Sequence, residues 1–246
     1  MINELKDLLS RQNFIFLDDV YFERDIGDQY VSNFSKQWKD FSKTQVDEFN
    51  GTTISRDLLK GVIFDEFDNL QDKCVLEVGC GSGRFTEHIA KYASSLIIND
   101  MSKAINYNHF RAKHNVLAIK SDFTNLKKLN LKFDIIICRG VLQHTPNPLN
   151  SILELLKLCK YEGSVYFDIY KKPKLRFFNS KYIWRRILKN KSYEDLYKFL
   201  DKNIDIILSI RRKINNLLKL NLNFFWDYLF PIYDYKDRLP LNNLQL

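Results

Sequence analysis

The chain has 246 residues, of which 45% are hydrophobic, and it carries a formal net charge of +8. This length and composition can fill one hydrophobic core with a modest appendage. Residues 1–11 are polar and lack the pattern of a secretory signal, and no apolar run approaches the ~20 residues of a membrane-spanning helix. The four cysteines have no C-x-x-C spacing, so we expect reduced thiols in a cytoplasmic protein.

The positive charge is concentrated toward the carboxyl terminus. Residues 171–246 contain 17 basic and 7 acidic side chains, whereas residues 1–170 contain 21 basic and 23 acidic ones. Such a basic segment favours an anionic substrate, a membrane surface or nucleic acid as its partner, and a solvated helical surface is the alternative.

Three regions follow one another along the chain. Residues 1–70 are predicted to be mostly helical, with Phe34, Trp38 and Phe41 in helical register and a helix over 55–67. Residues 71–170 alternate short apolar runs with helical stretches, which is typical of a parallel sheet covered on both faces. The predicted strands of this region are 74–78, 96–99, 116–120, 133–138 and 164–169.

The third region, residues 171–246, reads as basic, aromatic helix, most clearly over 185–200 and 205–220. We therefore expect an α/β fold, with a Rossmann-like, doubly wound and mostly parallel sheet and helices on both faces. A helical segment, 1–70, should close over one end of the site. The basic helical extension, 171–246, should form a lid over the other end, where the substrate would bind.

The glycine-rich turn after the first predicted strand is the most informative motif. Residues 74–90 read C-V-L-E-V-G-C-G-S-G-R-F-T-E-H-I-A, in which Glu77 precedes Gly79, Gly81 and Gly83. Glycines there let the backbone close over a cofactor at a helix amino terminus. A dinucleotide fingerprint would need glycine where this chain has Arg84. The pattern E-x-G-x-G-x-G instead resembles the first motif of class I S-adenosylmethionine (SAM) dependent methyltransferases.

Two acids follow the second and third predicted strands. Asp100 lies 17 residues beyond Gly83, where a carboxylate can grip a ribose diol, and capping of a helix at Ser102 is its alternative role. Asp122, in S-D-F, is a candidate acceptor for the adenine amino group, although Asp is also common in turns. Phe123 and Met101 are candidates to cover the two faces of the purine. These acids would complete a nucleoside pocket.

The segment from Cys138 to Thr145 should face the same site, because ligands bind outside the carboxyl ends of parallel strands. Its carbonyl groups are candidates to accept hydrogen bonds from the methionine ammonium group. His144 is the candidate general base, and a histidine bonded only to backbone is the alternative. An acceptor that is already anionic would need no base. His88, beside Phe85 on an apolar helical face, is assigned to core packing.

The acceptor would meet the ends of the fourth and fifth strands. Tyr166, Asp168 and Tyr170 share one face of the fifth strand, although buried packing would explain the tyrosines as well. A basic cluster follows immediately and would suit a phosphate-bearing acceptor. The candidate acceptor-binding residues are Arg139, Tyr170, Tyr182 and Arg185.

These motifs together resemble class I SAM-dependent methyltransferases over residues 55–170. A longer likeness, through Q-W-K-D-F-S-K-T-Q-V-D-E-F-N-G, I-S-R-D, V-L-Q-H-T-P-N-P, D-I-Y and K-Y-I-W-R, resembles a bacterial subfamily thought to act in surface-polysaccharide or other small-molecule pathways. The resemblance implies that SAM is the cofactor, and that Arg56 pairs with its methionine carboxylate. The residues that it places around SAM are Glu77, Gly79, Cys80, Gly81, Gly83, Asp100, Met101, Asp122, Phe123 and Cys138, with Gln37, Trp38, Thr44 and Arg56 closing from the amino-terminal side.

The expected reaction is in-line displacement at the sulfonium methyl group, with an oxygen of a small sugar- or phosphate-bearing acceptor as the first choice. Methylation of a lipid quinone at a membrane face is the alternative, and a SAM-binding scaffold without turnover is the second alternative. Neither a metal nor a nucleic-acid partner is expected. Class I folds end with a sixth strand and an antiparallel seventh, whereas 171–220 reads as helix, so the final strands are expected to be missing or displaced.

Overall fold

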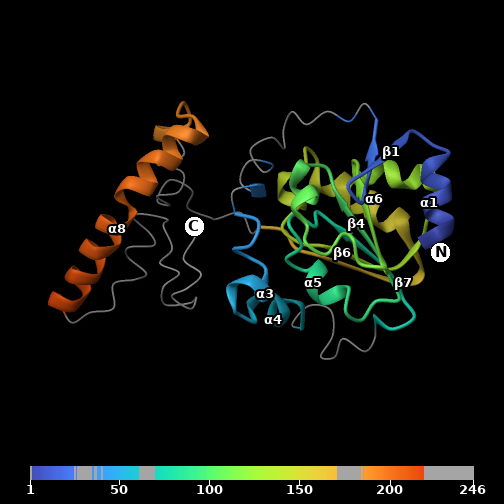
Figure 1. Ribbon diagram of the computed structural model, residues 1–246, viewed down its shortest axis with the longest axis horizontal. Coiled ribbons are helices and arrows are strands. Elements are labelled where there is room, and N and C mark those ends of the chain that lie inside the picture. Colours follow the sequence, from blue (N-terminus) through green and yellow to red (C-terminus); the bar gives the residue numbers. More distant parts are fainter. Residues whose placement is uncertain are drawn as a thin grey trace. The chain divides into compact units, whose positions relative to one another are not determined.

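A computed structural model gives the fold of the chain (Figure 1). One compact unit covers Met1–Tyr170 and a second covers Lys171–Arg238, and each is described by itself. The described residues are 2–24, 26, 35, 38–39, 41–60, 70–170, 184 and 186–218.

A seven-stranded sheet forms the centre of the first unit. Its spatial order is β1-β2-β5-β4-β3-β6-β7. All neighbouring strands run parallel except β1 and β2, so the mostly parallel, Rossmann-like sheet predicted from the sequence is confirmed. The strands are β1 Phe14–Leu17, β2 Val20–Glu23, β3 Cys74–Val78, β4 Ser95–Asp100, β5 Val116–Lys120, β6 Phe133–Cys138 and β7 Cys159–Phe167.

Helices cover both faces of this sheet, with α1 and α6 on one side and α4 and α5 on the other (Figure 1). Among the described helices, none combines the length and apolar composition that a bilayer crossing requires. The α-helices are α1 Ile2–Ser10, α3 Asp47–Asn50, α4 Ile54–Lys60, α5 Thr86–Ile89, α6 Pro148–Leu158 and α8 Tyr193–Leu218, and the 3₁₀ helices are η2 Lys103–Tyr107, η3 Phe123–Leu129 and η4 Leu142–His144.

Two apolar layers hold the sheet between the helices. Because successive side chains of a strand point to opposite faces, each buried strand contributes to both layers. On one face Leu76 belongs to the same cluster as Leu155 of α6. On the other face Val75 belongs to the same cluster as Ile89 of α5. The central strand β3 is buried along its whole length, which fixes the glycine turn at its end.

The amino-terminal region differs from the mostly helical prediction. Among its described residues, α1 and the short α3 and α4 are helical, and β1 and β2 make a hairpin. Of the helix predicted over 55–67, α4 contains residues 55–60, and 61–67 lie outside the described residues. Its two turn residues, Asp18 and Asp19, have φ values of 50° and 63°, the geometry that suits a two-residue hairpin turn. Val20 pairs with Ala118, so the hairpin extends the sheet beyond β5.

The last predicted strand and helices also need correction. β7 runs from Cys159 to Phe167, whereas the strand was predicted at residues 164–169. The segment K-Y-E-G, expected to be a turn, is part of the strand, because a register shift near Ile135 and a positive φ at Glu162 accommodate it. The helix predicted at 185–200 is interrupted at 189–192, and its residues 193–200 join 205–218 of the next predicted helix in one continuous helix, α8. Within the described part of the chain, the sheet ends at β7.

Candidate active site

A cavity of about 630 Å³ lies at the carboxyl ends of β3, β4, β5 and β6. This volume is within the range of small-molecule sites, and the position is where parallel α/β sheets bind their ligands. Each of the four strands contributes lining residues from its end: Gly79 after β3, Asp100 from β4, Ser121 after β5 and Arg139 after β6.

The glycine turn lines the cavity next to β3. Gly79 has a φ of +73°, and a Cβ atom there would overlap the side chain of Val141. Gly81 has a φ of +52°, and a Cβ atom there would lie 3.4 Å from the indole of Trp38. Glycine therefore meets two requirements at this turn, a left-handed backbone and close packing by side chains from distant segments. The helix that follows, α5, has only four residues and is shorter than the sequence suggests.

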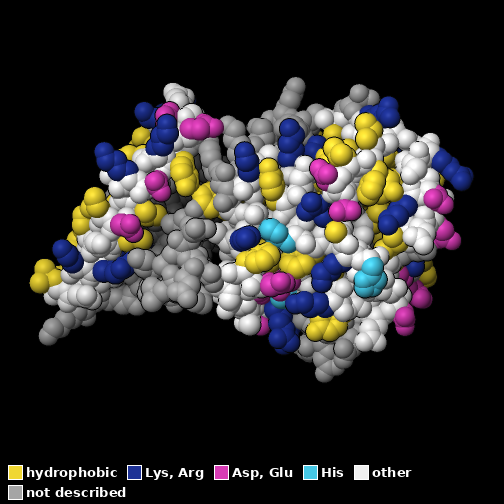
Figure 2. Space-filling view, in the orientation of Figure 1, with side chains coloured by type: hydrophobic (Ala, Val, Ile, Leu, Met, Phe, Trp, Pro, Cys, Tyr) yellow, Lys and Arg dark blue, Asp and Glu magenta, His cyan; other side chains and the backbone are white. Residues whose placement is uncertain are grey.

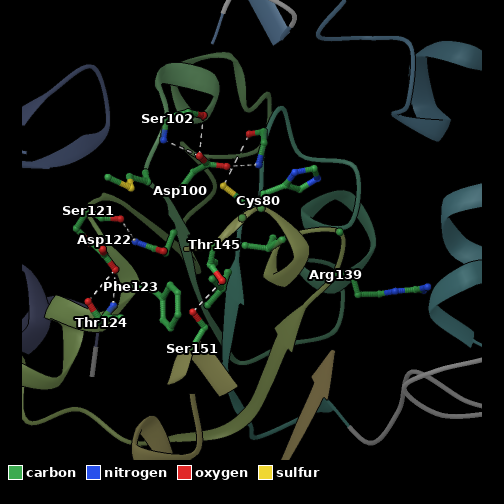
Figure 3. A pocket seen from close by; sticks show the side chains of 18 of the residues that line it. Cys80, Asp100, Ser102, Ser121, Asp122, Phe123, Thr124, Arg139, Thr145 and Ser151 are labelled. Atoms are coloured by element: carbon green, nitrogen blue, oxygen red, sulfur yellow. Dashed lines mark hydrogen bonds between the residues drawn. The ribbon is translucent and has the colours of Figure 1, made fainter. Parts of the chain in front are cut away.

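Asp100 projects from the end of β4 into the cofactor end of the cavity (Figure 3). Its Oδ2 accepts a hydrogen bond from the Gly81 N–H at 2.9 Å, and its Oδ1 accepts from the Ser102 N–H and hydroxyl. Burial raises the pKa of Asp100, and these hydrogen bonds only partly offset that effect. A carboxylate has about four acceptor positions, so one remains on Oδ2 for a ribose hydroxyl. Asp100 therefore lines the cavity, and it does not cap η2 itself, because Ser102 is the cap residue and Asp100 only accepts its N–H and hydroxyl. The ribose contact stays a prediction.

Asp122 lies beside Asp100 at the end of the neighbouring strand, β5 (Figure 3). Its Oδ1 accepts from the backbone N–H and the hydroxyl of Thr124 and caps η3. No described residue donates to its Oδ2, which leaves that oxygen for an adenine amino group. Phe123 and Met101 also line the cavity, one from each side of this pair of strands.

Several residues expected at the cofactor do not line the cavity. Glu77 is buried and accepts a hydrogen bond from the Thr86 hydroxyl at 2.6 Å. Cys138 is buried in the sheet, and Gly83 packs against Asn108. Arg56 lines a second cavity on the side of α5, and Thr44 donates to the Phe41 carbonyl. The remaining expected residues, Gln37, Tyr182 and Arg185, lie outside the described residues.

The amino-terminal segment supplies two lining residues, Trp38 and Gln45. Arg84 attaches this segment to the glycine turn, because its Nη1 donates to Gln45 Oε1 and its Nε donates to Ser55 Oγ, both at 3.2 Å. Neither Gln45 nor this role of Arg84 was predicted. The available signal was the long, polar side chain at the position where a dinucleotide motif has glycine.

A second polar contact holds the same segment. Asp47 lies 3.0 Å from His88 Nε2 and accepts from the backbone N–H groups of Ser55 and Arg56. Burial alone would raise the pKa of Asp47, but the backbone hydrogen bonds outweigh it and hold that pKa below its ordinary value. His88 therefore pairs with a carboxylate 41 residues earlier, in addition to the core packing expected for it.

The other end of the cavity is cationic and aromatic. The guanidinium groups of Arg84 and Arg139 lie over the ring of Phe85, 5.1 Å and 5.6 Å from its centroid. Arg139 extends away from the cofactor residues (Figure 3). His144 and Tyr170 line this end, with their rings edge-to-face and 6.3 Å between centroids.

Asp168 positions Arg139 without lining the cavity itself. Its Oδ2 pairs with Arg139 Nε at 3.3 Å, and its Oδ1 accepts from the Gly140 N–H at 2.6 Å. Arg139 Nη1 also donates to the Leu58 carbonyl of α4. Asp168, expected within the acceptor pocket, thus fixes the backbone and the arginine at the end of β6.

The first turn of α6 completes the lining and was not predicted. Asn147 caps this helix, since its side chain accepts from the Asn150 N–H, and Pro148 follows at the first helical position. Ser151 donates to the Thr145 hydroxyl at 3.0 Å. The N-P pair after L-Q-H-T-P is the sequence signal for this helix start, and it places these polar groups at the cavity.

The fold and the site together define an α/β protein of the class that binds a nucleotide-type cofactor at the carboxyl ends of its parallel strands. The chain belongs to the family described as "Methyltransferase domain", whose match covers residues 51–206. That family uses S-adenosyl-L-methionine. The resemblance found in the sequence is therefore confirmed.

Curated relatives agree with this family. A tRNA U34 carboxymethyltransferase from Campylobacter fetus is 27% identical over 176 residues, covering 68% of this chain and 61% of that protein. A ubiquinone biosynthesis O-methyltransferase from Coxiella burnetii is 34% identical over 103 residues, covering 40% of this chain and 44% of that protein. One from Hydrogenovibrio crunogenus is 25% identical and covers 73% and 76%. This chain thus spans less than two thirds of the first two relatives.

A solved structure of magnesium protoporphyrin IX methyltransferase from Synechocystis, with bound SAM, is 19% identical, with a TM-score of 0.44 and coverage of 73% of this chain and 88% of that one.

The residues present fit SAM. The uncommitted Oδ2 of Asp122 and the remaining acceptor position of Asp100 suit an adenine amino group and a ribose hydroxyl. The glycine turn leaves backbone without side chains beside them.

Proposed function

We propose that this chain is a SAM-dependent methyltransferase that methylates an oxygen of a small acceptor carrying negative charge. The observation that carries the acceptor class is the distribution of charge in the cavity. Among the described lining residues, both carboxylates, Asp100 and Asp122, are at the cofactor end, and Arg84 and Arg139 are at the other end. Guanidinium groups bind phosphate and carboxylate groups well, so this end favours an anion.

The residues of the chain divide the work between binding and proton transfer. When bound, SAM would supply a methyl group from its sulfonium, and the neutral thioether of the demethylated product would be the leaving group. Asp100, Asp122 and the glycine turn orient its nucleoside part. Arg139, fixed in place by Asp168 and the Leu58 carbonyl, supplies the cationic group at the acceptor end, and Arg84 holds the amino-terminal segment next to it. Holding the acceptor in line with the methyl group lowers the barrier by positioning. For a hydroxyl acceptor, His144 takes the proton at an imidazole nitrogen.

A sugar- or phosphate-bearing molecule is our first candidate acceptor, and its support is the paired arginines. The relatives described above are named for tRNA and ubiquinone chemistry, not for surface glycans. Membership in a surface-glycan pathway therefore has only the sequence resemblance behind it.

A quinone-type phenol is the second candidate, and two observations favour it. Two of the relatives are named ubiquinone biosynthesis O-methyltransferases. The acceptor end also presents the rings of Phe85 and Tyr170, against which an aromatic acceptor would pack. A phenol ionises more readily than an alcohol, so this acceptor would depend less on His144.

Titration calorimetry with SAM and with its demethylated product, S-adenosylhomocysteine (SAH), tests the cofactor site. We expect binding of both, and an Asp100→Ala variant should bind SAH about 10-fold or more weakly because a charge-assisted hydrogen bond is lost. Absence of binding would refute the proposal. Unchanged affinity in Asp100→Ala would refute the ribose assignment.

Methyl transfer is then measured by mass spectrometry with three acceptor sets: sugar phosphates, catechol-type quinone precursors, and bulk tRNA as the comparison. Turnover of the first or second set supports the proposal. Turnover of tRNA alone would overturn the small-acceptor class, and cofactor binding without turnover of any set would indicate a scaffold. With a hydroxyl acceptor, His144→Ala should lower kcat by a factor of about 10² or more without changing SAH affinity.

A further inference from the structure

The helix α8, in the second unit of the chain, has two apolar faces. One face is at least partly buried and includes Leu208. The other, which we call the outer stripe, consists of Phe199, Ile206, Ile210 and Leu217, with exposed fractions of 60%, 60%, 49% and 82%. Large aliphatic and aromatic side chains aligned on one exposed helix face mark an interaction surface more often than isolated ones do.

The spacing of the outer stripe is that of a coiled-coil seam. Its members are separated by seven, four and seven residues, and Asn203 and Lys213 occupy the two remaining seam positions. The stripe covers about 27 Å of helix, at about 1.5 Å per residue. These features predict another helix as the partner of this face.

The distribution of charge along α8 indicates which helix is the partner and whether the two helices run parallel or antiparallel. The amino-terminal half carries four acidic and two basic residues, whereas the carboxyl-terminal half carries three basic residues and no acidic one. They are Glu194, Asp195, Asp201 and Asp205 with Lys198 and Lys202 in the first half, and Arg211, Arg212 and Lys213 in the second. In Figure 2 the visible acidic side chains of α8 gather in its upper part, and basic ones continue to its lower end. An antiparallel copy of the same helix brings unlike halves together, and a parallel copy would bring like halves together.

We propose that the outer stripe is a self-association surface, on which α8 of a second copy of this chain docks antiparallel. In one register Phe199 faces Ile210 of the second copy, and Asn203 faces its Ile206. The same register brings Asp195 next to Lys213 of the second copy. Because the pairing is twofold symmetric, each of these contacts occurs twice. This inference is independent of the proposed function.

The alternation of acids and bases argues against other occupants. An anionic lipid surface or nucleic acid would favour a face without acidic residues. Asp195 and Asp205 would repel such partners, whereas they complement the basic half of a second copy.

Sedimentation velocity on the full chain, over a wide concentration range, tests the proposal. We expect a reversible monomer–dimer equilibrium, and Ile206→Asp should raise the dissociation constant by about 100-fold or more, since the charge enters the interface twice. Leu153→Asp on α6 is the matched control, because Leu153 is 49% exposed, as is Ile210, yet lies outside the stripe. The control should leave the equilibrium unchanged. Circular dichroism would verify that both variants keep their helices.

Charge reversal tests the direction of the pairing with variants that keep the apolar seam. Asp195→Lys or Lys213→Asp alone should weaken the dimer by about 10-fold, and the double variant should restore it. A wild-type chain that stays monomeric at all concentrations would overturn the proposal, whatever else covers the stripe. A dimer unaffected by Ile206→Asp would place the interface elsewhere. Single reversals that weaken the dimer without rescue by the double variant would overturn the antiparallel register.

Discussion

Glu77 provides the sharpest test of the buried architecture beneath the glycine turn. Its side chain is in the central strand β3, only 2% of the residue is exposed, and its Oε2 accepts the Thr86 hydroxyl proton at 2.6 Å. Thr86 in turn accepts from Asn108 Nδ2 at 3.0 Å, which orients the threonine proton toward Glu77. Burial, with Asp100 nearby, raises the pKa of Glu77 from 4.5 to about 8 despite the Thr86 hydrogen bond.

This shift makes stability depend on pH in a defined direction. The folded chain holds the Glu77 proton up to about pH 8, whereas the unfolded chain releases it near 4.5. The contribution of this group is therefore complete below pH 4.5 and is lost as the pH rises through the folded-state pKa of about 8. By proton linkage, the free energy of unfolding should fall by about 3.5 kcal/mol between pH 5 and pH 8 from this residue.

Glu77→Gln removes the proton equilibrium and nearly preserves the shape of the protonated side chain. Urea unfolding of both proteins at pH 5, 6.5 and 8 should show that the difference in their free energies of unfolding changes by about 3.5 kcal/mol in favour of the variant at high pH. Glu162→Gln on the exposed part of β7 is the control and should leave the wild-type profile unchanged. Parallel profiles for wild type and Glu77→Gln would refute the burial of an ionisable carboxyl group at this position.

Three further outcomes follow from the site. Arg84→Ala removes the hydrogen bond to Gln45, so calorimetry should show SAH affinity reduced about 10-fold with an unchanged circular dichroism spectrum. Gly83→Ala should destabilise the fold by roughly 2–4 kcal/mol in urea unfolding, because φ is +105° there and the added Cβ would lie 2.8 Å from Asn108 Oδ1. Burial raises the pKa of the Cys138 thiol to about 12, so Ellman's reagent should not modify it at about pH 8 until urea unfolds the chain.

The central strands were predictable because their signal is local. β3, β5 and β6 begin and end at the predicted residues, since each is a mostly apolar run bounded by charged or turn residues. The strand-end acids Asp100 and Asp122 followed from the same reasoning, because the carboxyl ends of parallel strands meet at one edge. Local sequence and sheet topology were therefore sufficient to predict that Asp100 and Asp122 line the cavity.

The hairpin and the attachment of the amino-terminal segment depend on long-range contacts. The run F-I-F-L lies in a region read as mostly helical, and its pairing with β2, in which Ile15 lies opposite Phe22, selects the strand. The pairing of Val20 with Ala118 in turn attaches β2 to the sheet. His88 and Asp47 are 41 residues apart, and nothing in the sequence around either residue predicts that they are in contact. Pair contacts of this kind are set by tertiary packing, which one sequence does not display.

Strand parity explains why Glu77 is absent from the cavity lining. Alternation places Glu77 on the same face of β3 as Val75, which packs toward α5, whereas Val78 reaches the cavity. The motif does contain the expected acidic residue. Which face of β3 its side chain points to depends on how many residues separate it from the end of the strand. Glu77 is therefore hydrogen-bonded to Thr86, at the start of the helix that follows the glycine turn, and does not line the cavity.

The glycine turn and the residues just after it have two linked roles. Gly81 lines the cavity and also receives the indole of Trp38, while Arg84 lines the cavity and holds Gln45. A ligand that fills this end of the cavity would therefore lie between the turn and the segment that supplies Trp38 and Gln45. A ligand that binds only when this segment is attached stabilises the attachment by its own binding free energy. Loosening the attachment should accordingly weaken cofactor affinity while leaving the sheet intact, because neither Gln45 nor Arg84 belongs to the two apolar layers that hold it.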